Sequence, residues 1–275
     1  IADMGSFGTF LYGFLLRLTG AVGLHHTIYP LFWYSSLGGS EVVAGQNIAG
    51  AQNIFFAQLA DPNHTGLFTY GTRFFAGRFA TMMFGLPAAS LAMYHSIPKQ
   101  NRKANGGIYF SSALTSFLTG ITEPLEYMFL FVAPWLYVVH AFLDGVSFYV
   151  ADLLSIRIGN TFSGGLIDFL LFGPLQGNAK TNWIWVIPVG IIWALIYYFV
   201  FRFLITKFKV MVPGMDESET DANMPVAPSG KASTLNDEAQ IIIQALGNQA
   251  NIESVTACAT RLRVSVKDGS IVDKN

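Results

Sequence analysis

Long apolar segments fill most of the first 210 positions and are separated by short polar or glycine-containing stretches. Residues 7–24, 74–97 and 183–206 are predicted to form apolar helices. The last of these has enough residues to cross a bilayer, which takes about 20. The second contains Gly85-Leu86-Pro87, a pattern that predicts a kink.

Basic residues follow two of these helices, at 99–103 and 202–209, and such ends face the cytoplasm in most membrane proteins. The last helix therefore starts outside and ends in the cytoplasm, so the stretch between residues 105 and 182 crosses the membrane an odd number of times. It contains three apolar pieces, 107–122, 125–150 and 161–175. Either all three pieces cross, or one crosses and the others re-enter.

Residues 40–72 are more polar than their surroundings and contain one apolar patch, Ile54-Phe55-Phe56. The patch is too short to cross a membrane. We therefore interpret this section as an interfacial or cavity-lining loop, because loops of this length in compact domains are usually functional.

Composition supports a membrane protein. Of 275 residues, 52% are hydrophobic and only 12% are charged, which is too apolar for a soluble domain of this size. The net charge of −1 gives no basic field for nucleic acid. A single cysteine excludes an internal disulfide framework and any cysteine-cluster metal site. We expect neither a metal nor a cofactor.

The segment Gly120-Ile121-Thr122-Glu123-Pro124-Leu125-Glu126 places a carboxylate inside an almost uncharged run. Pro124 removes a backbone donor and disfavours helical geometry at Glu123. We therefore predict Glu123 on a broken segment that lines a cavity and accepts hydrogen bonds from a polar solute. The alternative is a helix start at Glu123-Pro124, where the acidic side chain only complements the helix dipole.

The first apolar segment carries one charge, Arg17, and ends near His25 and His26. An arginine within a membrane span usually has a partner. Arg17 and His25 are eight positions apart, which places them on roughly the same face of a continuous helix. Histidine both donates and accepts hydrogen bonds, which suits sugar hydroxyls. Either histidine can equally well bond to a neighbouring helix.

The composition changes at Val212, and we divide the chain into a membrane domain (1–210), an acidic linker (211–233) and the start of a soluble domain (234–275). Residues 234–246 predict an amphipathic helix. Residues 252–257 and 262–266 predict two strands. One helix and two strands cannot bury a complete core, so we interpret the chain as a piece of a longer protein.

Cys258 lies between the two predicted strands, and the period of two places Arg261 and Arg263 on one face of the second strand. Two guanidinium groups near a cysteine favour its thiolate, which is a nucleophile. The same arginines suit a transferred phosphoryl group. Taken alone, a single cysteine beside arginine is more often inert.

Three motifs occur here in the order found in sugar permeases of the bacterial phosphoenolpyruvate-dependent phosphotransferase system. They are Gly23-Leu24-His25-His26, Gly120-Ile121-Thr122-Glu123-Pro124 and Cys258-Ala259-Thr260-Arg261-Leu262-Arg263. The chain resembles the glucose/maltose branch, in which a membrane enzyme IIC is fused to a cytoplasmic enzyme IIB. The resemblance implies an all-α polytopic membrane domain with re-entrant segments, followed by the start of a small α/β domain.

The resemblance also implies the chemistry. Cys258 is the residue phosphorylated by a phosphohistidine on enzyme IIA, and Arg261 and Arg263 assist the transfer. Glu123, His25, His26 and Arg17 belong to the sugar-site region. The parent is expected to be a homodimer in the bacterial plasma membrane, with its C-terminal domain in the cytoplasm. The first membrane spans of the family and the end of its IIB domain are missing, so the fragment alone is expected to be inactive.

The expected activity is import of a hexose with phosphorylation of its 6-hydroxyl. Glucose is favoured, with maltose or another glucoside as the alternative. The rival from another class is a permease or receptor that leaves its sugar unmodified. Cys258 and its two arginines separate these classes, because an unmodifying permease has no use for them.

Overall fold

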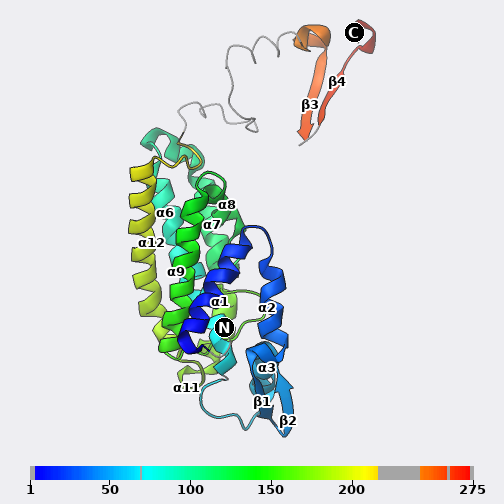
Figure 1. Cartoon of the computed structure of the whole chain (residues 1–275). Coiled ribbons are helices and arrows are strands. Elements are labelled where there is room, and N and C mark those ends of the chain that lie inside the picture. The colour runs from blue at the N-terminus through cyan, green and yellow to red at the C-terminus, as the bar shows by residue number, and fades with distance from the viewer. Residues whose placement is uncertain (1–3, 69, 216–241, 259–260, 273–275) are drawn as a thin grey trace. The chain divides into compact units, whose positions relative to one another are not determined.

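The computed structural model of the chain describes residues 4–68, 70–215, 242–258 and 261–272. The chain divides into two compact units, Ile1–Ala222 and Asn223–Asn275. The first unit carries nearly all of the helices and the second carries a β-hairpin (Figure 1). Each unit is described separately.

The first unit is a bundle of helices with one small hairpin attached. Its helices are α1 (Gly5–Gly20), α2 (His25–Tyr34), α3 (Ala51–Ala60), α4 (Arg73–Ala76), α5 (Arg78–Ala80), α6 (Leu86–Ser96), α7 (Arg102–Thr119), α8 (Glu123–Leu130), α9 (Pro134–Leu153), α10 (Leu166–Phe172), α11 (Asn178–Thr181) and α12 (Val186–Phe208). The hairpin consists of β1 (Ser40–Val43) and β2 (Gln46–Ala49), paired antiparallel.

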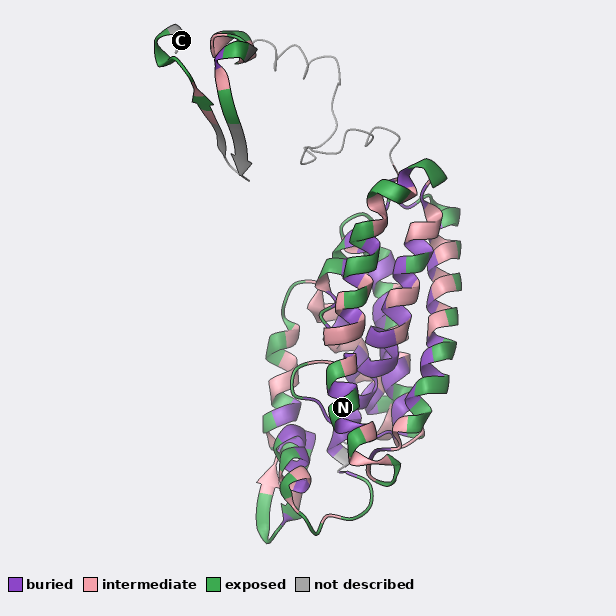
Figure 2. Cartoon of the chain, turned by 180° about the vertical axis from the view of Figure 1, so that it is seen from behind, coloured by how far each residue is buried: buried purple, intermediate pink, exposed green. Residues whose placement is uncertain are grey.

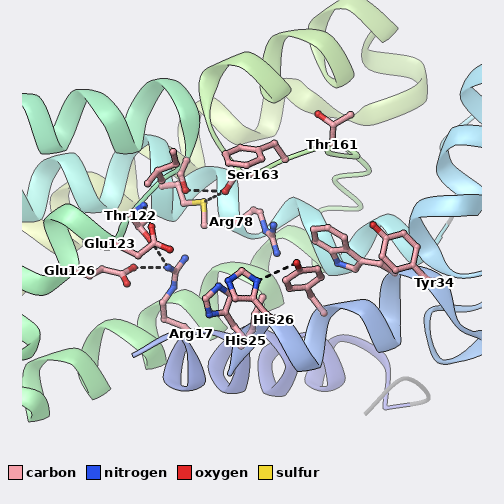
Figure 3. A pocket seen from close by; sticks show the side chains of 18 residues that line it. Arg17, His25, His26, Tyr34, Arg78, Thr122, Glu123, Glu126, Thr161 and Ser163 are labelled. Atoms are coloured by element: carbon pink, nitrogen blue, oxygen red, sulfur yellow. Dashed lines mark hydrogen bonds and ion pairs between the residues drawn. The ribbon is translucent and has the colours of Figure 1, made fainter. Parts of the chain in front are cut away.

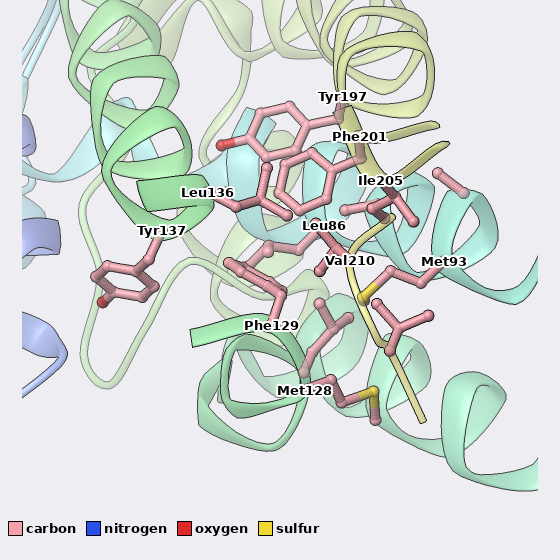
Figure 4. Packing of buried hydrophobic residues seen from close by; sticks show 14 of the residues in the cluster. Leu86, Met93, Met128, Phe129, Leu136, Tyr137, Tyr197, Phe201, Ile205 and Val210 are labelled. Carbon is pink, nitrogen blue, oxygen red and sulfur yellow. The ribbon is translucent and has the colours of Figure 1, made fainter. Parts of the chain in front are cut away.

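The core of the bundle lies between α6, α8, α9 and α12. α1 packs along α9, while α12 packs along α6, which also contacts α7. Leu86, Phe129, Leu136 and Phe201 are completely buried where these helices meet (Figure 4). The buried faces of the helices turn inward together (Figure 2). Burial of these large apolar side chains holds the bundle together.

The outer face of α12 is apolar as well. Ile191, Leu195, Phe199 and Phe203 follow one another at intervals of four residues, and each is more than half exposed. A helix that is apolar on every side belongs in a membrane rather than in water. In the described part of the chain, Pro134–Leu153 and Trp183–Phe208 are long and apolar enough to cross a membrane.

The predicted single helix over 74–97 is divided into shorter elements. α4 and α5 precede a π-helical segment, Thr81–Gly85, and α6 follows it. A π segment disturbs the normal pattern of helix hydrogen bonds, and here Ser116 Oγ of α7 donates to the carbonyl of Met82 at 2.7 Å. A Cβ on Gly85 would lie 2.8 Å from the Tyr197 ring. α12 is therefore in close contact with the predicted kink region.

The first predicted helix ends earlier than expected, and the predicted loop is wrong in its local structure. A turn at residues 21–24 separates α1 from α2. The polar section contains the β1–β2 hairpin and α3. Ile54 and Phe55 of α3 are completely buried, so the apolar patch anchors this section to the bundle.

The three apolar pieces between 107 and 175 also take different forms. Most of the first lies in α7, which has 18 residues and ends at Thr119. The second covers most of α8 and most of α9, which are separated by a break at residues 131–133. The third contains α10, whose seven residues are too few to cross a bilayer.

The described part of the second unit contains strands β3 (Ile252–Cys258) and β4 (Arg261–Val266). They pair antiparallel, with Cys258 opposite Arg261 and Thr256 opposite Arg263. Cys258 is therefore the last residue of a strand rather than a residue between strands. Residues 242–245 are helical, as predicted, whereas the predicted start of that helix lies outside the described residues, as does most of the predicted linker.

Candidate functional site

A cavity of about 330 Å³ opens inside the first unit, where α1, α2, α5 and α8 meet two loops (Figure 3). Its wall combines ionisable, hydroxyl and aromatic side chains. The lining residues are Leu16, Arg17, Gly20, His25, His26, Tyr29, Trp33, Tyr34, Arg78, Met82, Gly120, Ile121, Thr122, Glu123, Glu126, Thr161, Phe162 and Ser163. Its size lies at the lower end of the range for small-molecule sites, which is roughly 300–1,000 Å³.

Arg17 forms three side-chain hydrogen bonds in the cavity wall. Its Nε donates to Asp144 Oδ2 of α9 at 3.0 Å, and its Nη1 donates to Glu126 Oε1 of α8 at 2.5 Å. Nη1 also lies 3.0 Å from the hydroxyl of Thr122. Arg17 is 9% exposed, and it has the partners that the sequence led us to expect. These bonds join α1, α8 and α9 at the cavity.

Glu126 continues this network into the bundle. Its Oε1 also lies 3.2 Å from His140 Nε2, and its Oε2 accepts from Tyr137 at 3.4 Å. His140 Nδ1 lies 2.8 Å from the Tyr197 hydroxyl of α12. Glu126 is not among the site residues expected from the sequence. Its position three residues after Glu123, on the same side of a helix, is the signal that points to it.

Glu123 is the first residue of α8, so the predicted non-helical backbone is wrong at that residue and the helix-start interpretation is correct there. The break comes just before, at Gly120–Thr122. The carboxylate of Glu123 nevertheless lines the cavity. Its Oε2 accepts a hydrogen bond from the Thr122 amide at 3.1 Å.

The break before α8 is fixed by a second loop. Gly120 has φ +74°, a conformation that favours glycine. Its carbonyl accepts from Ser163 Oγ at 2.9 Å. A Cβ on Gly120 would lie 2.7 Å from that oxygen and 2.8 Å from the amides of Gly164 and Gly165. The loop around Ser163 is in turn held by Asp168, which accepts from the amides of residues 161–163.

His25 and His26 begin α2 and both line the cavity. Their ring centroids are 4.0 Å apart. His26 Nδ1 lies 3.3 Å from the Tyr29 hydroxyl, whereas His25 Nδ1 has no hydrogen-bond partner among the described residues. The prediction that Arg17 and His25 share a continuous helix is wrong, because the turn at 21–24 intervenes. The turn still brings both residues to one cavity.

Arg78 is a further cavity residue, and no motif in the sequence singles it out. It is 6% exposed, and its guanidinium carbon lies 5.4 Å from the centroid of the Trp33 ring. No hydrogen bond or ion pair of Arg78 is present in the described structure, and its Nε is buried without a partner.

The remaining predicted site residues lie in the second unit. The backbone register pairs Cys258 with Arg261, and Arg263 follows two positions later on β4. Within the described residues, no group of three or more histidine, cysteine, aspartate or glutamate side chains is arranged to hold a metal ion. The structure thus gathers Arg17, His25, His26 and Glu123 in one cavity of the first unit.

Comparison with family models gives two matches along the chain. Residues 1–145 match the family described as "Phosphotransferase system, EIIC". Residues 240–273 match the family described as "phosphotransferase system, EIIB". The first match contains most of the cavity-lining residues, and the second contains Cys258, Arg261 and Arg263.

Proposed function

Because the chain belongs to the EIIC family of the phosphotransferase system and carries an EIIB segment behind it, we propose that the cavity binds the sugar and that Cys258 phosphorylates it. The family establishes the general activity. The chain is part of a fused sugar transporter that uses an EIIA phosphoryl donor. We propose which residues bind the sugar, which sugar is bound and which covalent intermediate forms.

The contents of the cavity support a sugar site. Carboxylates accept hydrogen bonds from hydroxyl groups, and histidine and arginine donate to hydroxyl oxygens. Glu123, His25 and His26 present such groups at one cavity. Tyr29 and Trp33 add aromatic wall beside them. A solute with hydroxyl groups on several sides and apolar C–H faces fits this mixture, and among sugars we favour glucose, with maltose or another glucoside as the alternative.

The proposed transfer has two steps. The Cys258 thiolate attacks the phosphorus of the phosphohistidine on EIIA, so that a sulfur–phosphorus bond forms while the nitrogen–phosphorus bond breaks and its electron pair returns to the imidazole. The 6-hydroxyl oxygen of the sugar then attacks phosphorus, the sulfur–phosphorus bond breaks to regenerate the thiolate, and the hydroxyl proton passes to water. Arg261, opposite Cys258 in the strand register, and Arg263 are proposed to stabilise the charge on the phosphoryl oxygens.

The observation that carries this proposal is the EIIB match around Cys258, downstream of an EIIC match that contains most of the cavity. A permease or receptor that leaves its sugar unmodified needs no EIIB segment. The test uses the full-length parent protein with the upstream phosphoryl donors and radiolabelled phosphoenolpyruvate. Wild-type protein should carry label on Cys258 that passes to added glucose or maltose.

The Cys258→Ser variant should bind sugar like wild type and form no sugar phosphate, because serine stays protonated at neutral pH and does not replace the thiolate. Ser254→Ala, at an exposed position of the same strand, is the matched control and should transfer label normally. Label that reaches the sugar equally well in the Cys258→Ser protein would remove Cys258 from the pathway.

A further inference from the structure

One charged side chain of the cavity, that of Arg78, has no role in the proposed sugar site. Arg17 has two carboxylate partners, but Arg78, which is equally buried, has none within the described structure. A buried cation is costly unless it is paired and hydrogen-bonded. The side chain lines the cavity, and in the view of Figure 3 it lies between the Arg17–Glu123 group and Tyr34. The acceptors that it lacks are therefore expected from the contents of the cavity.

Two carboxylates outside the cavity lining, Asp144 and Asp168, are engaged by other donors. Asp144 accepts from Arg17. Asp168 accepts from the backbone and hydroxyl of Thr161 and from the amides of Phe162 and Ser163. Neither forms an ion pair with Arg78 in the described residues. Among the described residues, no carboxylate forms a salt bridge with Arg78.

The arginine is also held in a defined place. Its guanidinium carbon is 5.4 Å from the Trp33 ring centroid, within the range of a cation–π interaction. Its stem passes beneath the second loop, where a Cβ on Gly164 would lie only 2.6 Å from Arg78 Cγ. A side chain fixed in this way loses little conformational freedom when it binds a ligand. The site is thus arranged in advance for an acceptor.

We propose that Arg78 is a specificity-determining residue that donates hydrogen bonds to acceptor oxygens of the bound sugar. This inference rests on the proposed sugar site. The planar fork of arginine donates two parallel hydrogen bonds, so its preferred ligand feature is a pair of neighbouring hydroxyl oxygens. A sugar that lacks this feature leaves the buried guanidinium unpaired, and sites of that kind reject such analogues strongly.

The test measures equilibrium binding to the full-length parent protein. The probes are glucose or maltose, whichever the wild type binds more tightly, and the monodeoxy analogues of that sugar. In the wild type, removing the hydroxyl that faces Arg78 should weaken binding about ten- to hundredfold. In Arg78→Met, the parent sugar should bind as weakly as that analogue, and the discrimination at this one position should disappear.

Two further variants distinguish a failure of the Arg78 assignment from a failure of the proposed sugar site. Glu123→Gln should weaken binding and keep the discrimination attributed to Arg78. Arg202→Met is the matched control, because Arg202 bonds to Ser96, does not line the cavity, and should leave sugar binding unchanged. If neither sugar binds to wild type, the proposed sugar site fails. If sugar binds and Glu123→Gln weakens it while Arg78→Met retains wild-type affinity and discrimination, only the Arg78 assignment fails.

Thermal stability distinguishes a binding role from a structural one. An unpaired buried charge does not stabilise the sugar-free protein, and replacing it with an apolar side chain of similar size is often neutral or favourable. The Tm of sugar-free Arg78→Met should therefore not be lowered, although its sugar affinity falls. A lower Tm together with weaker binding of every analogue to the same degree would assign Arg78 a structural role and overturn the proposal.

Discussion

Replacing Arg17 with Met tests whether the buried ion network stabilises the bundle. The substitution removes the cation that joins Glu126 to Asp144 and leaves an uncharged side chain of similar length. Glu126 keeps contacts with His140 and Tyr137. Asp144 loses its charged partner, and its Oδ1 is already without a hydrogen bond. The variant thus contains an uncompensated buried carboxylate.

The expected cost follows from similar buried pairs. Removing one partner of such a pair destabilises a protein by about 3–5 kcal/mol. For a domain of this size, each kcal/mol lowers Tm by about 2–4 °C. We therefore expect the Tm of the full-length Arg17→Met protein to fall by about 6–20 °C, measured by thermal unfolding in detergent with tryptophan fluorescence. The variant should still insert into the membrane, since Met is tolerated in lipid better than Arg.

A second substitution, at Asp144, tests whether the ion pair with Arg17 stabilises the bundle. Neutralising Asp144 in the same protein removes the charge that Arg17→Met leaves unpaired. The double variant Arg17→Met/Asp144→Asn should be more stable than the sum of the two single effects predicts, by about 1–3 kcal/mol. Strictly additive effects, or a Tm of Arg17→Met within about 2 °C of wild type, would show that the network does not hold the helices together.

Two other substitutions test the cavity. Glu123→Gln in the full-length protein should weaken sugar binding about ten- to hundredfold, because an ionised acceptor becomes a neutral amide, and unchanged affinity would leave Glu123 with only its role at the start of α8. Gly120→Ala should lower stability by about 1–2 kcal/mol through its left-handed backbone conformation alone, with a further cost from contact with the second loop. Thermal unfolding and sugar binding of the Gly120→Ala protein should be measured together to detect this loss of stability. A wild-type Tm would show that the loop around Ser163 moves away from the new Cβ without an energetic cost.

The helical character of the membrane part could be predicted because it depends on local composition. An apolar segment such as that of α12 forms a helix wherever lipid or a protein core surrounds it. The helix ends were less predictable. The divided region from α4 to α6 depends on Ser116 of another helix and on space that Gly85 leaves for Tyr197. These are tertiary contacts, which no local pattern contains.

The same limit applies to the partners within the site. The sequence indicates that Arg17 needs a partner, but Asp144 lies 127 positions away and Glu126 lies 109 away. Arg78 was overlooked for a related reason. Arg78 lies near the start of the predicted apolar helix over 74–97, and an arginine near a helix end is usually interpreted as a charge at the membrane surface. Only the packing of Trp33 and Gly164 around it shows that it is buried in the cavity wall.

The two carboxylates on α8 show how the structure sharpens a prediction made from a motif. Glu126 is bonded to Arg17, His140 and Tyr137, so both of its oxygens are already engaged by protein donors. Glu123 accepts only the Thr122 amide among the described residues, and that bond leaves one oxygen open to the cavity. A sugar hydroxyl therefore finds its acceptor at Glu123, while Glu126 keeps Arg17 in place. Both residues carry the same carboxylate group. Their roles differ because protein donors bind both oxygens of Glu126 but only one oxygen of Glu123.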